Sequence, residues 1–331
     1  MAFDPPLTGF LSAHARYAAH AAGALGYRFR SLDGADGYLF EVRDGPRAAF
    51  FSAGACTPYA LNDARAAALA RDKAFTSAAL EARGLPAVPG RMFFITERWR
   101  EMRGPGREPA DARDYAADAD YPLFCKPISG SNGQYAELIE SEAAFLDYME
   151  RAGREHFAIL VQPYLRGAEY RVFALEGEAL FFYAKRAPQI IGDGERNVAA
   201  LAQALVRPNA PALGGTRARD ADGRVYAAAE IPARGARLVL DGPANRAVGG
   251  GASLPSEHVP APLAALAVAA AGALDLQLAG VDIFDVSPEG DFSDLRIIEV
   301  NSNPMIYTLE ENGRWDLIEK IWRANFAKAL K

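Results

Sequence analysis

The chain has 331 residues, of which 50% are hydrophobic, so it can bury a substantial core and is expected to form two or three lobes. Its net charge is −6 and it has no block of Lys or Arg, which argues against nucleic acid as a partner. Cys56 and Cys125 form no metal-binding or redox spacing, and the N-terminus carries no basic and apolar leader, so a cytoplasmic location is expected.

Apolar periodicity and turn residues alternate along the chain between helix and strand patterns, which predicts a mixed α/β protein. The Ala-rich run 263–278 is interrupted by Gly272, Asp275 and Gln277, which favours a buried helix over a membrane span. Asn62 and Ser141 are the expected helix caps. The predicted elements are helices at 7–25, 62–70, 73–83, 140–151, 198–206, 263–278 and 315–330, strands at 27–31, 37–42, 48–52, 121–127, 156–165, 169–175 and 180–186, strands near 230 and 238, a loop at 207–224, a strand at 280–286, and a last strand within the stretch 295–304.

The last predicted strand carries Glu299 and Asn301 two residues apart, so their side chains point to one face. A hairpin centred near Gly290 would bring Asp282 opposite Asn301 on that same face, provided that no bulge shifts the register. Taken alone, Glu-x-Asn on a strand is typical of a solvated face. Together with Asp282 it gives three oxygen ligands without sulfur or imidazole, the set that Mg²⁺ prefers. We therefore predict a metal site at Asp282, Glu299 and Asn301.

Lys126 ends a predicted strand and is followed by the Gly/Ser loop Ser129–Gly133. Backbone N–H groups of such a loop can hold phosphate oxygens, and a nearby lysine adds a positive charge. The lysine precedes the glycines, whereas it follows them in a Walker A loop, so a P-loop fold is not supported. By itself this loop is also compatible with a plain hairpin turn.

Farther along, the strand ending at Gln162 breaks at Pro163, and Tyr164 and Leu165 follow. A strand that breaks into a short hinge leaves backbone groups that can pair with an adenine edge, although an edge strand and a turn explain the pattern too. Glu169 is a candidate for ribose hydroxyls.

Basic residues follow this hinge, with Arg171 on the next strand and Lys185 and Arg186 at the end of the one after it. Beside a metal cluster they suit a triphosphate or a carboxylate substrate, and as isolated cations they would be ordinary surface charges. The chain has no Gly-x-Ser-x-Gly elbow and neither Cys has a nearby His, so covalent catalysis has no visible nucleophile. His14, on the first predicted helix, is expected to be solvated or half-buried.

Read in order, these motifs resemble the ATP-grasp superfamily of carboxylate–amine ligases, and more closely the ATP-grasp module of cyanophycin synthetases and bifunctional glutathione synthetases. The resemblance runs from about residue 61 to residue 305. Its motifs are Asn62, the segment from Leu69 to Thr76, Leu80 with Gly84–Gly90, the Lys126 strand and loop, Gly167–Arg171, Arg186 with Ile191–Gly194, Asn245 with Gly249–Ala252, Gly280–Asp282, and Glu299–Asn301.

The resemblance implies an ATP-grasp fold in which two α/β lobes hold ATP between them. The implied divisions are a short N-terminal lobe at 1–70, a smaller lobe at 71–162, and a larger lobe with the metal site at 163–331. ATP and two Mg²⁺ ions, or Mn²⁺, are the implied cofactors. The implied roles are phosphate contacts from Lys73, Lys126 and the loop residues Ser129, Gly130, Ser131 and Gly133, adenine contacts from Gln162, Tyr164 and Leu165, a ribose contact from Glu169, metal ligation by Asp282, Glu299 and Asn301, and catalysis by Arg171, Lys185, Arg186 and Asn245.

The expected function is therefore ATP-dependent amide or peptide bond formation through an acyl phosphate, with release of ADP and phosphate. Small-molecule carboxylates and amines, such as amino acids or short peptides, are the expected substrates. The resemblance allows a homo-oligomer, and no membrane partner is expected from the sequence. Two alternatives remain open. One is a nucleotide-binding regulator without turnover, and the other is an ATP-grasp kinase that forms no amide.

Overall fold

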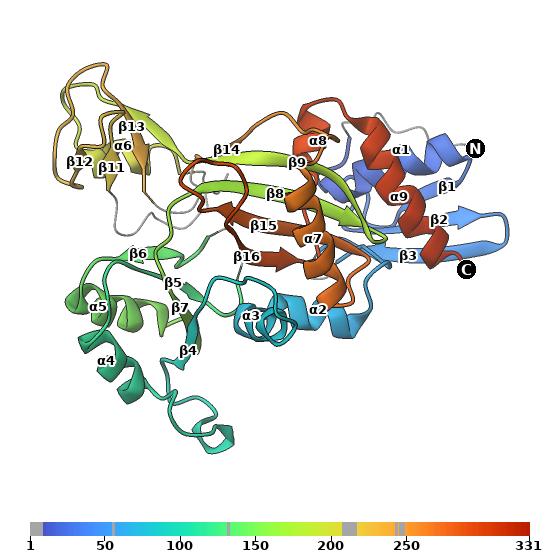
Figure 1. The fold of residues 1–331 in the computed structure, drawn as a ribbon. Helices are drawn as coiled ribbons and strands as arrows, with labels where there is room; N and C mark the ends of the chain where they lie inside the picture. Colours follow the sequence, from blue (N-terminus) through green and yellow to red (C-terminus); the bar gives the residue numbers. More distant parts are fainter. Residues whose placement is uncertain (1–8, 55–56, 131–132, 207–216, 242–243, 245–248) are drawn as a thin grey trace.

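The computed structural model describes residues 9–331 except 55–56, 131–132, 207–216, 242–243 and 245–248 (Figure 1). The helices are α1 (Ala13–Leu25), α2 (Ala64–Arg71), α3 (Lys73–Ala82), the 3₁₀ turn η1 (Arg100–Met102), α4 (Pro109–Ala117), α5 (Glu142–Ala152), α6 (Val198–Gln203), α7 (Ala261–Ala273), α8 (Tyr307–Glu311) and α9 (Trp315–Ala329). The strands are β1 (Arg28–Ser31), β2 (Leu39–Asp44), β3 (Arg47–Ser52), β4 (Arg91–Phe94), β5 (Leu123–Pro127), β6 (Glu137–Ile139), β7 (Ala158–Pro163), β8 (Ala168–Leu175), β9 (Glu178–Arg186), β10 (Gln189–Ile191), β11 (Ala218–Arg219), β12 (Val225–Tyr226), β13 (Arg237–Leu240), β14 (Gly251–Ala252), β15 (Leu278–Asp285) and β16 (Leu295–Asn301).

The centre of the molecule is a five-stranded antiparallel sheet in the order β14-β9-β8-β15-β16 (Figure 1). The apolar helix α7 covers one face and packs on β15, β8 and β9. Val172, Val281 and Ile283 are fully buried beneath it, because alternate residues of a strand point to the same face. The residues that alternate with these three along the strands point to the opposite face of the sheet.

At one end of this sheet lies the N-terminal sheet, β1-β2-β3, with α1 and α9 packed beside it (Figure 1). Its core is aromatic: Trp322 of α9 is fully buried and contacts Phe40, Phe51 and Tyr59. The first and last parts of the described chain thus share one core.

On the other side, a four-stranded sheet in the order β4-β7-β5-β6 is covered by α4 and α5 (Figure 1). We call it the β5 sheet. The segment before β4 ties it to the central sheet, because Ile297 donates its N–H to the Pro86 carbonyl at 2.8 Å and accepts from the Val88 N–H at 2.9 Å. A further small sheet, β10-β13-β11-β12, lies outermost with α6 and has its own apolar core.

The structure confirms the mixed α/β class, and several boundaries differ from the sequence prediction. The first helix begins at Ala13 because the Ser12 side chain caps it, rather than at residue 7. Asp63, rather than Asn62, caps α2 and accepts from the Ala66 N–H. No strand lies at Glu230, and the nearest one is Val225–Tyr226. Among the described residues, no helix is long and apolar enough to cross a membrane.

Candidate functional site

The face of the central sheet turned away from α7 carries charged side chains. The strand register pairs Arg171 of β8 with Asp282 of β15, and Asp282 with Glu299 of β16. Paired residues of antiparallel strands share a face, so the three side chains lie in one row. Glu169 and Lys185 join this row through ion pairs.

The two predicted carboxylate ligands face each other, but their register differs from the prediction. Asp282 lies opposite Glu299, and Gly280 lies opposite Asn301. The pairing shifts between Asp282 and Ile283, where a bulge puts an extra residue into the ladder. The expected pairing of Asp282 with Asn301 was wrong, because the pairs next to the turn, such as Asp285 with Leu295, centre the ladder on residue 290. The bulge moves the partner of Asp282 by one position only, from Ile298 to Glu299. All three still share a face, and the Asn301 amide donates to the Gly280 carbonyl at 3.4 Å.

Asp282 is only 2% exposed and is held by two cations. Arg171 donates from Nε and Nη2 to its two oxygens, each at 2.6 Å, and Lys185 donates at 2.9 Å. Lys185 also donates to Glu169. Burial alone would raise the pKa of Asp282, but Arg171 and Lys185 outweigh it and lower that pKa. Asp282 is therefore a carboxylate whose charge is fully engaged within the protein.

Two lysines come from outside the central sheet. Lys73, the first residue of α3, pairs with Glu299 at 3.2 Å and donates to the Gly130 carbonyl at 3.0 Å, which brings the Gly/Ser loop to the site. Lys126 of β5 is 5% exposed and makes one weak contact among the described residues, to the Ile298 carbonyl at 3.5 Å. Burial lowers the pKa of Lys126 to about 8.

We call the seven residues that meet here the charged cluster. It consists of the cations Lys73, Lys126, Arg171 and Lys185 and the carboxylates Glu169, Asp282 and Glu299.

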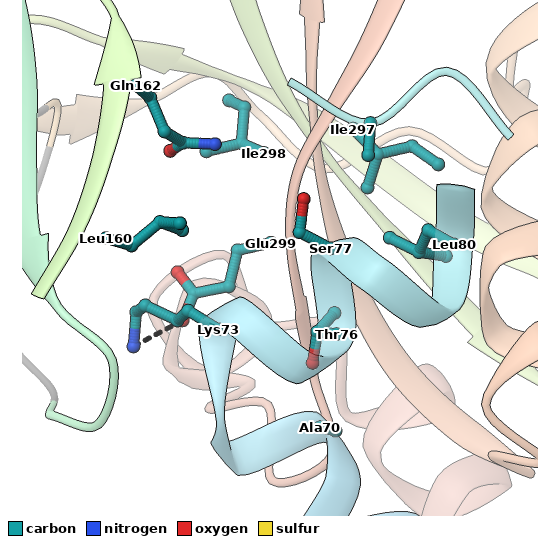
Figure 2. Close-up of a pocket in the computed structure, with 11 residues that line it drawn as sticks. Ala70, Lys73, Thr76, Ser77, Leu80, Leu160, Gln162, Ile297, Ile298 and Glu299 are labelled. Carbon is teal, nitrogen blue, oxygen red and sulfur yellow. Dashed lines mark ion pairs between the residues drawn. The ribbon is translucent and has the colours of Figure 1, made fainter. Parts of the chain in front are cut away.

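A small hollow, partly open to solvent, adjoins the cluster between α3, β7 and β16 (Figure 2). Lys73 and Glu299 form one wall, and the Leu160 and Ile298 side chains supply apolar surface. Figure 2 shows Gln162 beside Ile298 on the far side from α3, and its amide donates to the Val88 carbonyl at 2.9 Å. The predicted hinge residue thus borders the hollow.

Sequence reasoning did not find every lining residue of this hollow. Thr76 and Ser77 of α3 line it, and so does Ile298 of β16. The helical spacing of Thr76 and Ser77 after Lys73 could have indicated a shared face near the site. Ile298 was recognised only as a strand former, because a single sequence does not tell which strand residue lines a hollow.

The structure does not bring every predicted residue together. Arg186 follows Lys185 on β9, so it points to the other face of the strand, and it is exposed. The Tyr164 N–H donates to the Pro122 carbonyl at 3.2 Å, and Tyr164 and Leu165 are half-buried after β7. Ser131 and Asn245 lie outside the described residues.

The oxygen ligands of the site suit a divalent cation that is bound together with phosphate groups. In the described part of the chain, no three His, Cys, Asp or Glu residues form a group that could hold a metal by themselves. Mg²⁺, however, is usually bound by one or two carboxylates together with substrate phosphates rather than by an all-protein cage. The facing Asp282 and Glu299, with Asn301 two residues along β16, fit that arrangement.

Sequence comparison gives relatives with related chemistry, although no family model matches the chain. A bifunctional glutathione-biosynthesis protein of Streptococcus agalactiae is 27% identical over 207 residues, which make up 57% of this chain and 28% of the relative. A cyanophycin synthetase of Nostoc sp. is 26% identical over 254 residues, 71% of this chain and 26% of the relative. A D-alanine–D-alanine ligase of Ectopseudomonas mendocina is 30% identical over 123 residues, 37% of this chain and 35% of the relative. The chain thus spans roughly a third or less of each relative's length.

Among solved structures, a bifunctional glutathione synthetase from Pasteurella multocida is similar over 95% of this chain and 45% of its own, with 19% identity and a TM-score of 0.49. The glutathione-biosynthesis protein and the cyanophycin synthetase are of the two kinds that the ordered motifs predicted. The chain resembles ATP-grasp carboxylate–amine ligases.

Proposed function

We propose that the protein is an ATP-dependent ligase that joins a carboxylate to an amine through an acyl phosphate and releases ADP and phosphate. Amino acids or short peptides are the proposed substrates, because the relatives are named for glutathione, cyanophycin and D-alanyl-D-alanine. The observation that carries the proposal is a buried ammonium, Lys126, next to two facing carboxylates on the central sheet.

Lys126 supports phosphate binding because its charge is buried without a carboxylate in contact. Its one contact among the described residues is a carbonyl at 3.5 Å, and an ammonium removed from water in this way is costly to the free protein. A phosphate oxygen would supply the missing partner. Lys73, which reaches both the Gly/Ser loop and Glu299, would add a second positive charge to the same phosphates.

In this proposal Asp282, Glu299 and the Asn301 side-chain oxygen would hold two Mg²⁺ ions together with the triphosphate. When bound, Mg²⁺ neutralises phosphate charge and aligns the γ-phosphate for in-line transfer. The nucleotide base would lie at Gln162–Leu165 beside Ile298, and Glu169 would reach the ribose. We also propose that the β5 sheet and the central sheet belong to separate lobes, divided near residue 162.

The proposed reaction has two steps, and negative charge develops in each of them. A substrate carboxylate oxygen bonds to the γ-phosphorus as the bond to the β-phosphate oxygen breaks, and ADP leaves. The amine next attacks the acyl carbon, phosphate departs, and the amine loses a proton. Arg171 and Lys185 would face the negative charge that develops on the transferred group and on the tetrahedral oxygen, a contribution of roughly 3 kcal/mol for one such donor.

The test is ATP turnover in a pool of amino acids and dipeptides with Mg²⁺. Lys126→Ala and Glu299→Ala are expected to lower ADP formation by about a hundredfold or more, with unchanged circular dichroism. Lys320→Met, which removes an exposed lysine of α9, is the control and should keep full turnover. Normal turnover by both site variants would refute the proposed site.

The product distinguishes the rival activities. A condensed product together with ADP and phosphate supports ligation. A stable phosphorylated product would instead identify a kinase, and binding of ATP without turnover on any pool would favour the regulator.

A further inference from the structure

Every carboxylate of the charged cluster already has a cation from the protein. Asp282 is held by Arg171 and Lys185, and the same Lys185 reaches Glu169. Glu299 is paired with Lys73 at 3.2 Å. A metal ion that bound Asp282 would therefore compete with a two-pronged guanidinium and an ammonium rather than with water.

The charge count points the same way. The cluster contains the cations Lys73, Lys126, Arg171 and Lys185 against the carboxylates Glu169, Asp282 and Glu299, which leaves one positive charge in excess. Lys126 and Asp282 are nearly inaccessible to water, so unbalanced charge there is poorly screened. A divalent cation that binds alone would add to the positive excess of the cluster. A divalent cation that binds together with a triphosphate would not, because the negative charge of the triphosphate offsets that excess.

We propose that Arg171 and Lys185 lock Asp282 against free divalent cations, so that the metal binds only together with a polyphosphate that draws these two cations away. This inference rests on the proposed nucleotide site and concerns the order in which the metal and the nucleotide bind there. The lock couples the two ligands, and such coupling is reciprocal: the nucleotide must bind more tightly with the metal by the same factor.

The lock also determines when Arg171 and Lys185 can contact a substrate. In the free protein they are engaged with Asp282 and are not available to a substrate. Only the complex with metal and nucleotide would release them toward the transferred phosphoryl group. The lock would thus keep a substrate carboxylate from occupying these cations before the nucleotide is bound.

The test uses Mn²⁺ alone, with the free ion counted by electron paramagnetic resonance. The wild-type protein is expected to bind Mn²⁺ weakly. Lys185→Met removes one of the two donors to Asp282 Oδ2, which still accepts from Arg171 Nη2, and it also removes the positive excess. We therefore expect the variant to bind Mn²⁺ alone about tenfold more tightly or better. Arg171→Gln provides an independent second variant with the same expected direction.

Two controls match these changes. Lys320→Met removes an exposed lysine, and Arg151→Met breaks a bidentate Arg–carboxylate pair with Glu137, at 2.8 and 2.9 Å, outside the cluster. Neither should change Mn²⁺ binding. Tight binding of Mn²⁺ by the wild-type protein, or no gain in folded Lys185→Met and Arg171→Gln, would overturn the lock.

Calorimetry with a non-hydrolysable ATP analogue separates this inference from the proposed function. We expect the analogue to bind the wild-type protein at least about tenfold more tightly with Mn²⁺ than with EDTA, and this ratio to shrink in Lys185→Met. Equal affinity with and without Mn²⁺ would contradict the lock alone. Absence of binding under every condition would contradict the nucleotide site itself.

Discussion

Lys126 combines burial with a charge that the carboxylates of the charged cluster compensate only in part. Because its folded pKa of about 8 lies below its ordinary value of 10.5, the ammonium costs stability at neutral pH. Between pH 8 and 10.5 the folded protein has lost this proton while the unfolded chain keeps it, so stability rises with pH across that window. A residue retained at such a cost is typical of a binding site.

We therefore predict that Lys126→Met stabilises the free protein while abolishing nucleotide binding. The flexible Met side chain fills a similar volume without a charge, so the free energy of unfolding at pH 7 should rise by about 1–3 kcal/mol. Urea denaturation at pH 7 and pH 10 measures it, and the gain should be smaller at pH 10. A variant less stable than the wild type at pH 7 would show that the ammonium is well compensated.

His14 provides a second pH-dependent residue, far from the charged cluster. Contrary to the expectation of a solvated or half-buried side chain, it is 5% exposed and lies against Tyr17, Tyr59 and Trp322. Burial lowers the pKa of His14 from 6.5 to about 4. Between pH 6.5 and pH 4 His14 is protonated in the unfolded chain but neutral in the folded protein, so stability falls as the pH drops from 6.5 to 4.

His14→Leu should remove this acid sensitivity. Between pH 7.5 and pH 5 the wild-type protein is expected to lose about 2 kcal/mol more than the variant. Tryptophan fluorescence during urea unfolding is a suitable probe, because Trp315 and Trp322 both belong to this core. Equal losses in the two proteins would mean that His14 is protonated in the folded state.

Single residues of the site were predictable where chemistry alone identifies them. Carboxylates and an amide on β-branched strands indicated Asp282, Glu299 and Asn301, and a lysine before a Gly/Ser loop indicated Lys126. Their partners were not predictable. The pairing of Lys185 with both Asp282 and Glu169 depends on the order of strands in the sheet, which one sequence does not encode locally.

At the scale of elements, the first strand of the β15–β16 hairpin was located to within two residues, and the second lies within the predicted stretch 295–304, because β-branched runs bounded by a turn are a strong signal. The register was missed because the turn-rich segment 287–294 does not reveal the centre of the hairpin, and a shift of one residue in that centre changes the partner of Asp282 by two positions. The helix Pro109–Ala117 was also missed, since it buries only Ala112 and Ala116 and shows little apolar periodicity.

A close approach of backbones fixes the start of β8. A Cβ atom at Gly167 would overlap the Asp285 carbonyl of β15, and neither backbone can move without breaking the pairing of Ala168 with Asp285. Gly167→Ala should therefore lower the free energy of unfolding by about 1–3 kcal/mol, as urea denaturation would measure.

The matched control is Gly23→Ala within α1, where a Cβ meets nothing within 4 Å. There the same substitution should stabilise by about 0.5–1 kcal/mol, because alanine is the better helix former. If Gly167→Ala did not lower the free energy of unfolding, the backbone of Gly167 would not lie as close to the Asp285 carbonyl as it does in the structure.

At the scale of the whole molecule, the charged cluster is assembled from parts distant in sequence. Lys73 comes from α3, Lys126 from the β5 sheet and Asp282 from the central sheet, so a ligand in contact with all three would link these parts. We predict that an ATP analogue with Mg²⁺ raises the thermal midpoint by about 3 °C or more at saturation. EDTA should remove most of that rise. A shift that is independent of the metal would argue against a shared site.

The central claim is that the charged cluster binds metal-bound nucleotide through the buried ammonium of Lys126. Isothermal titration of a non-hydrolysable ATP analogue with Mg²⁺ into the wild-type protein and into folded Lys126→Met tests it most directly. The account predicts one nucleotide bound per wild-type chain, and affinity lower by about a hundredfold in the variant. Equal affinity for the two proteins, or no binding to the wild-type chain, would contradict it.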